Sequence, residues 1–186
     1  MTAPTYGSAT ASGGVGPQPD NGIVVSGEPD VQHLYVETAT SMYPGRLVKK
    51  GTHDNDIVVN TAGGLAVGVL GYEHCPKKDR PATRDTIYAV DTLAPVLKKG
   101  KGAIVLLYVA QNQTIVKGSK LVAAADGMVS LAPAAAPPSG TVAVVSTSAQ
   151  PTALGPIPSS GPIVATAEES ITTTNAEGFV MATLEL

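Results

Sequence analysis

Short apolar runs alternate with glycine- and proline-rich breaks along most of the chain. Several runs combine β-branched residues with a two-residue alternation of apolar and polar positions, which is typical of half-buried strands. The clearest of them are "HLYVETAT" (33–40), "IVVNTA" (57–62), "LAVGVLGYE" (65–73), "IYAVDT" (87–92), "AIVLLYVA" (103–110) and "TVAVVS" (141–146). This pattern predicts an all-β fold, a small barrel or sandwich of short strands with Gly/Pro-rich turns and an extended N-terminal arm.

Glycine-containing turns separate the expected strands. Pro44–Gly45 and Gly63–Gly64 are typical turn dipeptides, and "KKGKG" (98–102) predicts a basic turn between two apolar strands. Asp126–Gly127 predicts a hairpin, because both central residues of such a tight turn need a positive φ. Residues 175–178 predict a turn between the last two strands.

The composition changes sharply near residue 30. Residues 1–30 consist mostly of Gly, Ser, Thr, Ala and Pro, so we expect a flexible N-terminal arm that buries little apolar surface. Residues 31–186 form the expected β domain, which contains a long Pro/Gly/Ser loop at 147–162. Inside the arm, "GIVVSG" (22–27) is β-prone, and we expect it to add a strand to the sheet edge of a partner.

The composition also excludes several classes of protein. The chain has 20 Gly and 15 Pro among 186 residues and only 4% aromatic residues, which argues against long helices. No apolar run approaches the ~18 residues that a membrane-spanning helix needs. The N-terminus lacks the basic start and apolar core of a signal peptide, so we expect synthesis in the cytoplasm. A lone cysteine, Cys75, excludes an internal disulfide and predicts a small buried or half-buried hydrophobe.

Charge is unevenly distributed along the sequence. All 12 Lys and Arg residues lie between Arg46 and Lys120, a segment that has six acids and therefore a net charge of +6. The flanking segments contain nine acids and no base. Two interpretations stay open: the zones steer a polar partner, or they neutralise each other within one fold.

Candidate chemical groups are few and scattered. The three histidines lack a ligand spacing, and "THDND" (52–56) has fewer oxygen ligands than a calcium loop requires, so a solvated turn is the better interpretation. Glu168 and Glu169 are neighbours that diverge on a strand, and they indicate a bend or strand end. The basic loop "PKKDRPATR" (76–84) is diluted by acids and lacks interleaved aromatics, which argues against direct binding of nucleic acid. We therefore expect no enzymatic activity, no metal site and no cofactor.

The segment "TIVKGSKLVAAADGMVSLA" (114–132) has the strand–turn–strand rhythm of a lipoyl or biotin carrier. A carrier needs a lysine at the tip of its hairpin, where the amide to the cofactor forms. Here the tip is Asp126–Gly127–Met128, and the nearest amines, Lys117 and Lys120, precede the strand. The hairpin is retained as a prediction, and the carrier function is not.

The chain resembles the capsid cement or head decoration proteins of tailed phages. The resemblance rests on "YPGRLVKKG" (43–51), "NTAGGLAVGVLGYE" (60–73) and the continuous strand-and-turn region 93–132, and it covers roughly residues 35–186. Many such proteins end in a strand with a central Glu, a Gly turn and a last apolar strand, and 161–186 is similar to that ending. The loops at 133–139 and 147–162 are longer than those of compact members.

The resemblance implies a structural virion protein that binds the outer surface of the capsid shell and stabilises it. It implies the major capsid protein as partner, a homotrimer on the capsid, and a location on the virion surface, without contact to nucleic acid or membrane. We expect the arm to make the contact through Gly22, Ile23, Val24, Val25 and Ser26. The alternative is a β-rich host- or carbohydrate-binding accessory module of a phage tail or spike, although the seven aromatic residues offer few stacking platforms.

Overall fold

The computed structural model describes residues 23–72, 85–133 and 161–186 of the chain. Within these ranges the protein is nearly all β, with 51% of residues in strands, which confirms the predicted fold class. The first strands are β1 (Val24–Val36), β2 (Leu47–Lys50), β3 (Asp56–Val59), β4 (Gly68–Leu70), β5 (Leu93–Val109) and β6 (Thr114–Ile115). They are followed by β7 (Lys120–Ala123), the short 3-10 turn η1 (Ala125–Gly127), β8 (Val129–Leu131), β9 (Ile163–Ala167), β10 (Ile171–Thr172) and β11 (Gly178–Leu184).

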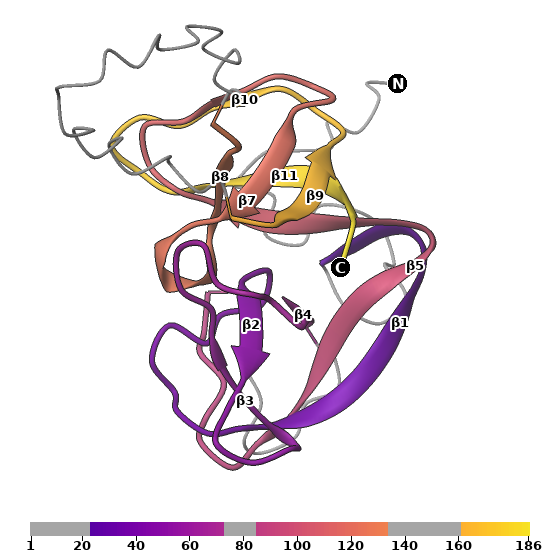
Figure 1. The fold of residues 1–186 in the computed structure, drawn as a ribbon, viewed down its shortest axis with the longest axis vertical. Coiled ribbons are helices and arrows are strands. Elements are labelled where there is room, and N and C mark those ends of the chain that lie inside the picture. The colour runs from indigo at the N-terminus through magenta and orange to yellow at the C-terminus, as the bar shows by residue number, and fades with distance from the viewer. Residues whose placement is uncertain (1–22, 73–84, 134–160) are drawn as a thin grey trace, which may run out of the picture.

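The strand pairings close two rings that share β5. The first barrel has the order β1–β3–β2–β4–β5 and closes because β5 also pairs with β1. The second barrel has the order β5–β11–β9–β7–β8 and closes through the contact of β8 with the end of β5 at Val109. The two barrels are stacked, the first at the bottom of Figure 1 and the second at the top, and β6 and β10 form a separate two-stranded ladder. Closure removes most of the open sheet edges.

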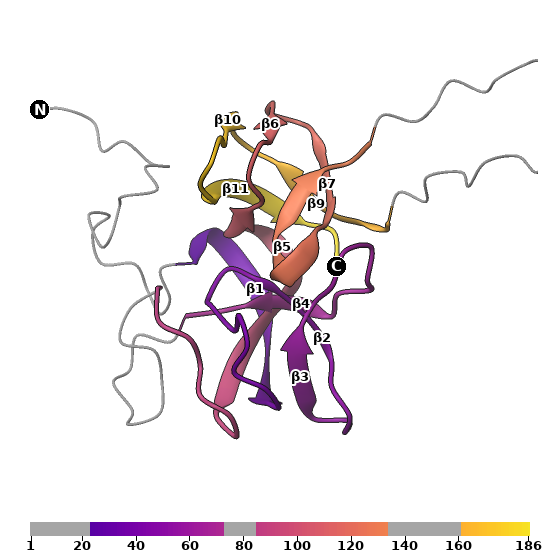
Figure 2. The ribbon, with the colours of Figure 1, turned by 90° about the vertical axis from the view of Figure 1, so that its left-hand side faces the viewer.

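Strand β5 connects the two barrels without interruption. It is 17 residues long and runs straight through "KKGKG", so the predicted turn at 98–102 is wrong. The ladder between β1 and β5 shifts register several times between Val24 and Asp30, which bends both strands where one barrel passes into the other. Figure 2 shows the ribbon of β1 and β5 from the side.

Glycines near these register shifts allow the backbones of β1 and β5 to come unusually close. A Cβ atom at Gly100 would lie 2.0 Å from the Glu28 carbonyl oxygen, and one at Gly27 would lie 2.1 Å from the Gly102 carbonyl oxygen. Gly27 and Gly102 also have positive φ values of 77° and 63°. The glycines therefore permit close antiparallel pairing of β1 and β5 here, and do not reverse the chain.

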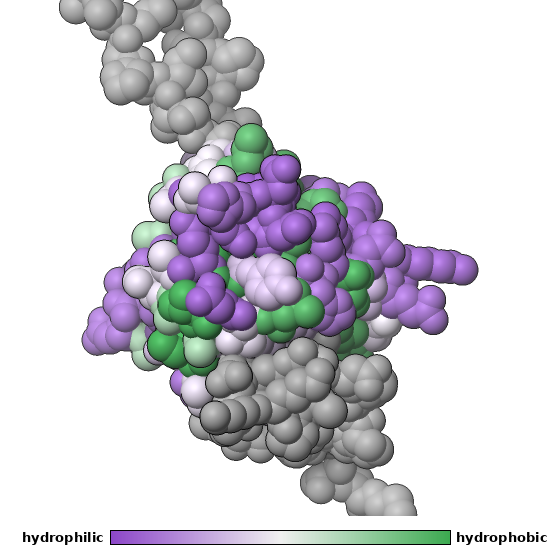
Figure 3. Space-filling model, turned by 90° about the horizontal axis from the view of Figure 1, so that it is seen from below, coloured by the Kyte–Doolittle hydropathy of each residue, from purple (hydrophilic) through white to green (hydrophobic). Residues whose placement is uncertain are grey.

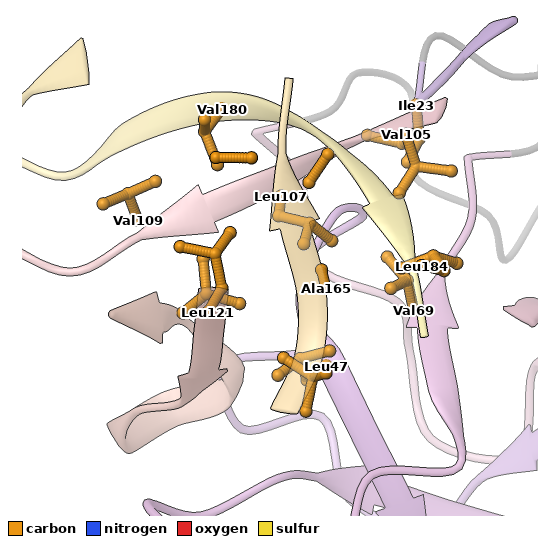
Figure 4. Close-up of a cluster of buried hydrophobic side chains, with 14 of the residues drawn as sticks. Ile23, Leu47, Val69, Val105, Leu107, Val109, Leu121, Ala165, Val180 and Leu184 are labelled. Atoms are coloured by element: carbon orange, nitrogen blue, oxygen red, sulfur yellow. The ribbon is translucent and has the colours of Figure 1, made fainter. Parts of the chain in front are cut away.

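Two clusters of buried side chains fill the barrels. The first barrel encloses Leu34, Val36, Met42, Val48, Ile57, Leu70, Tyr88, Ala94 and Val96. The larger cluster fills the second barrel and continues down to the outer face of the first, where Figure 4 shows Leu47 and Val69. Leu97 of β5 belongs to the same cluster. Consecutive pairs such as Leu47–Val48 are fully buried because one residue faces its own barrel and the next faces the other. This double burial holds the barrels together.

Several expected elements differ in extent. Within the described residues 65–72 of this segment only the three-residue β4 forms, and Leu65 is 78% exposed, so the predicted long apolar strand is wrong there. The segment 87–92 is a turn around buried Tyr88 and not a strand. The Asp126–Gly127 hairpin is confirmed: both residues have positive φ, and β7 pairs with β8 on either side of them.

The β domain begins earlier in the sequence than the predicted residue 31. Strand β1 begins at Val24, and Ile23 is fully buried in the larger cluster, so the β domain includes residues that the sequence assigns to the arm. The reason is the long ladder with β5, which a local reading of composition does not detect. Residues 1–22 of the predicted arm, most of the predicted loop 147–162 and the predicted strand 141–146 lie outside the described residues.

Candidate functional site

The segment expected to contact a partner lies within the fold. Ile23 is buried, Val24 and Val25 are half-buried, and Ser26 is exposed, while Gly22 lies outside the described residues. Val24 and Ser26 pair with Val105 and Ile104 of β5. The segment therefore has a partner strand in its own chain along one edge, and its contact with a partner protein stays a prediction.

Most other candidate groups of the sequence have structural contacts. Glu168 and Glu169 form the bend after β9: Thr183 Oγ1 donates to Glu168 at 2.7 Å and the Met181 N–H donates to Glu169 at 2.8 Å. These bonds confirm the predicted bend and attach it to β11. Cys75 and the basic loop 76–84 lie outside the described residues. Among the residues that are described, no group of three or more His, Cys, Asp or Glu side chains is placed to hold a metal ion.

The charge zones of the sequence meet within the fold. In the register of β1 and β5, Glu28 lies opposite Lys101 and Asp30 opposite Lys98. Glu185 pairs with Lys99 at 3.5 Å and with Lys120 at 3.4 Å. Acids of the flanking segments thus lie beside bases of the central segment, which supports internal neutralisation over long-range steering by a basic zone.

The Glu185 carboxylate links β9, β5, β7 and β11. The Thr166 hydroxyl, which donates to it at 3.0 Å, lowers the pKa of Glu185 below the usual 4.5, and the neighbouring Lys120 and Lys99 lower it further. In the first barrel, the hydroxyl and N–H groups of Thr52 donate to Glu37 and likewise lower its pKa.

These two lowered pKa values predict part of the acid sensitivity of the protein. A carboxyl group whose pKa is lower in the folded state adds stability that is complete above its unfolded pKa and is lost as pH falls through its folded pKa. We therefore expect Glu185→Gln to flatten the decrease in stability below about pH 4.5, by under about 1 kcal/mol because the side chain is partly exposed. Urea unfolding at a series of pH values measures the effect. Glu37→Gln should act in the same direction and independently, and profiles parallel to the wild type for both variants would contradict the prediction.

Arg46 is a buried charge that the sequence analysis did not single out. Its side chain is 8% exposed and lies where the two barrels meet. One guanidinium nitrogen donates to Glu177 at 2.7 Å, and another donates to the Asp126 carbonyl oxygen at 2.8 Å. The guanidinium carbon lies 5.1 Å from the ring centre of Tyr43 and 4.9 Å from that of Tyr108. We call Arg46 with these four partners the Arg46 cluster.

The local sequence places Arg46 in this cluster. Tyr43–Pro44–Gly45–Arg46 forms a turn closed by the Arg46 N–H and the Tyr43 carbonyl at 3.2 Å, with Gly45 at a φ of 89°. This is the Pro-Gly turn expected from the sequence, and it brings Tyr43 beside Arg46. The other partners come from β5, η1 and the residue before β11, so only the Tyr-Pro-Gly-Arg motif gave a local signal. The bonds of Arg46 Nη1 and Nη2 join the two barrels, while Arg46 Nε is buried without a hydrogen-bond partner in the described structure.

A different surface remains available along the outer side of β1 in the first barrel. Val31 and Tyr35 lie on β1 and are 49% and 47% exposed, and Val90, in the turn before β5, is 49% exposed. Backbone bonds hold this turn and the loop before β3 against the end of β1: Tyr35 N–H donates to the Asn55 carbonyl at 2.8 Å, and Asp91 N–H to the Val36 carbonyl at 2.8 Å.

Four acids lie in the segments next to Tyr35. Asp54 and Asp56 flank Asn55, Asp56 is the register partner of Tyr35 in β3, Asp91 follows Val90, and Glu37 follows β1. Lys50 lies in the same loop region, where its ammonium group donates to the Asp54 carbonyl. We call Val31, Tyr35, Val90 and these four acids the Tyr35 surface. Figure 3 shows the protein from below, with hydrophobic groups lying among hydrophilic ones.

No protein-family model matches the sequence, and no curated protein matches it. No helix in the described part of the chain has the length and apolar character needed to cross a membrane.

Proposed function

We propose that the protein is a structural virion component that binds the outer surface of a capsid shell and stabilises it. The observation that carries the proposal is the Tyr35 surface. It presents exposed apolar side chains on a fold of two closed β-barrels, each with its own buried core. The polar clusters elsewhere in the described residues serve internal bonds, as in the Arg46 cluster and around Glu185. The resemblance of the sequence to head decoration proteins agrees with such a role and supplies the partner, the major capsid protein.

The two-barrel architecture suits a protein that reinforces a shell. A binding surface placed on strands keeps its shape when load is applied, because each strand is fixed by neighbours on the closed ring. Many copies on a repeating shell give strong total retention even when each contact is weak. A contact of about 800 Å² per partner is ordinary for a stable complex. A homotrimer on the capsid is part of this proposal and multiplies the contacts of each unit.

Co-sedimentation tests the proposed function. The purified chain is mixed with DNA-filled heads of its source phage that lack their own copy, and the bound fraction is measured over a concentration series. We expect saturable binding at a fixed ratio to the major capsid protein, and a higher temperature of DNA release from the decorated heads. Absence of binding at every salt concentration would reject the proposal.

A further inference from the structure

The Tyr35 surface combines two features that together specify the chemistry of a partner. The first is exposed apolar area at Val31, Tyr35 and Val90, each close to half exposed. The second is a group of four carboxylates in the segments next to Tyr35, where Lys50 and His53 are the neighbouring bases. Tyr35 has these acids on both sides, because the Asn55 and Val36 carbonyl groups hold the two acidic segments against β1.

We propose that the Tyr35 surface is the docking face for the capsid shell, and that it takes a shell surface with apolar side chains ringed by Lys or Arg. This inference rests on the proposed function. A tyrosine at the centre of an interface contributes a large, rigid contact area, and its ring face accepts a guanidinium group. The surrounding carboxylates then pair with the same basic side chains, and Val31 and Val90 contact apolar groups at either side.

Charge argues against a second copy of the same surface as the occupant. A two-fold contact would place the four acids of one copy opposite the four acids of the other, and like charges across an interface are unfavourable. A glycan is the other occupant that an exposed tyrosine attracts. The two valines favour protein over glycan, because β-branched apolar side chains add contact area but no hydrogen bond to a sugar.

Two pairs of substitutions separate the apolar and the charge contributions. Val31→Ser with Tyr35→Ser removes the apolar contact, and Asp54→Asn with Asp91→Asn removes two charges. Asn tolerates the positive φ of 60° that Asp91 adopts, so the second pair preserves the turn.

The matched apolar control is Val116→Ser with Ile163→Ser, whose side chains are 59% and 46% exposed on the other half of the molecule. The matched charge control is Gln111→Lys with Thr114→Lys, which changes the net charge by the same amount.

Each variant is tested for binding to the undecorated heads at several salt concentrations, after circular dichroism and thermal unfolding establish that it is folded. We expect the apolar pair to weaken binding roughly 10- to 30-fold, as for loss of an interface hot spot. We expect the charge pair to weaken binding at low salt and to flatten its salt dependence. Both control pairs should bind like the wild type.

The remaining outcomes overturn the inference in distinguishable ways. Wild-type binding that survives both pairs of substitutions rejects the Tyr35 surface and leaves the proposed function standing. Loss by the apolar pair alone rejects the basic partner. Failure of the wild type to bind heads rejects both proposals together. Self-association, or binding to a glycan array, that is lost in the apolar pair assigns the surface to a different occupant.

Discussion

Gly100→Ala should lower the free energy of unfolding by about 3 kcal/mol, a large effect for adding a single methyl group. The added Cβ would lie 2.0 Å from the Glu28 carbonyl oxygen, 2.6 Å from the Pro29 Cα and 2.9 Å from the Asp30 nitrogen. All three are backbone atoms of β1, so no side-chain rotation relieves the clash and the two strands must separate. For a chain of this size the change corresponds to a decrease of roughly 6–12 °C in melting temperature.

Gly102→Ala is the matched control two residues further along β5. Its φ of 63° makes any side chain unfavourable, but no heavy atom lies within 4 Å of the added Cβ. The cost is therefore the backbone term alone, about 1–2 kcal/mol. Urea unfolding of both variants measures the difference. Equal destabilisation would mean that β1 and β5 do not approach each other closely at Gly100.

The close approach of β1 and β5 at Gly100 could not be predicted from the sequence. The apolar runs on both sides of "KKGKG" predicted strands, and the structure has them. Whether the glycines reverse the chain or permit two strands to pair closely depends on β1, which lies about 70 residues earlier in the sequence. The local pattern is the same in both cases, so only the pairing partner distinguishes them. The same ladder explains why the predicted arm reached too far into the β domain.

Features that depend on adjacent residues were easier to predict. Pro44–Gly45 and Asp126–Gly127 form turns because their backbone preferences act within a few residues. The Tyr35 surface shows the opposite case: Tyr35 is part of an alternating run, but its acids come from four separate positions in the first barrel. The charge zones can be recognised in the sequence. The fold determines which acids lie beside bases of the central segment and which acids lie together in the segments next to Tyr35.

Arg46→Ala should destabilise the protein by about 2–4 kcal/mol, because it removes a mostly buried charge that several groups share. The Glu177 carboxylate loses its 2.7 Å ion pair, the Asp126 carbonyl oxygen loses a donor, and Tyr43 and Tyr108 lose the guanidinium between them. Since these partners come from both barrels, we expect the loss to reduce the cooperativity of unfolding as well, with a lower urea m-value.

Two further variants test that reason for the effect of Arg46. Arg46→Lys keeps the charge but not the planar group that reaches Glu177 and Asp126 together, so its stability should fall between wild type and Arg46→Ala. Lys117→Ala removes an exposed base from a turn and should change stability by less than about 0.5 kcal/mol. If Arg46→Ala were as mild as Lys117→Ala, the shared side-chain burial of Leu47, Val69 and Leu97 would be sufficient to hold the two barrels together. A large loss with an unchanged m-value would instead mean that the cluster stabilises one cooperative body and not the junction between two.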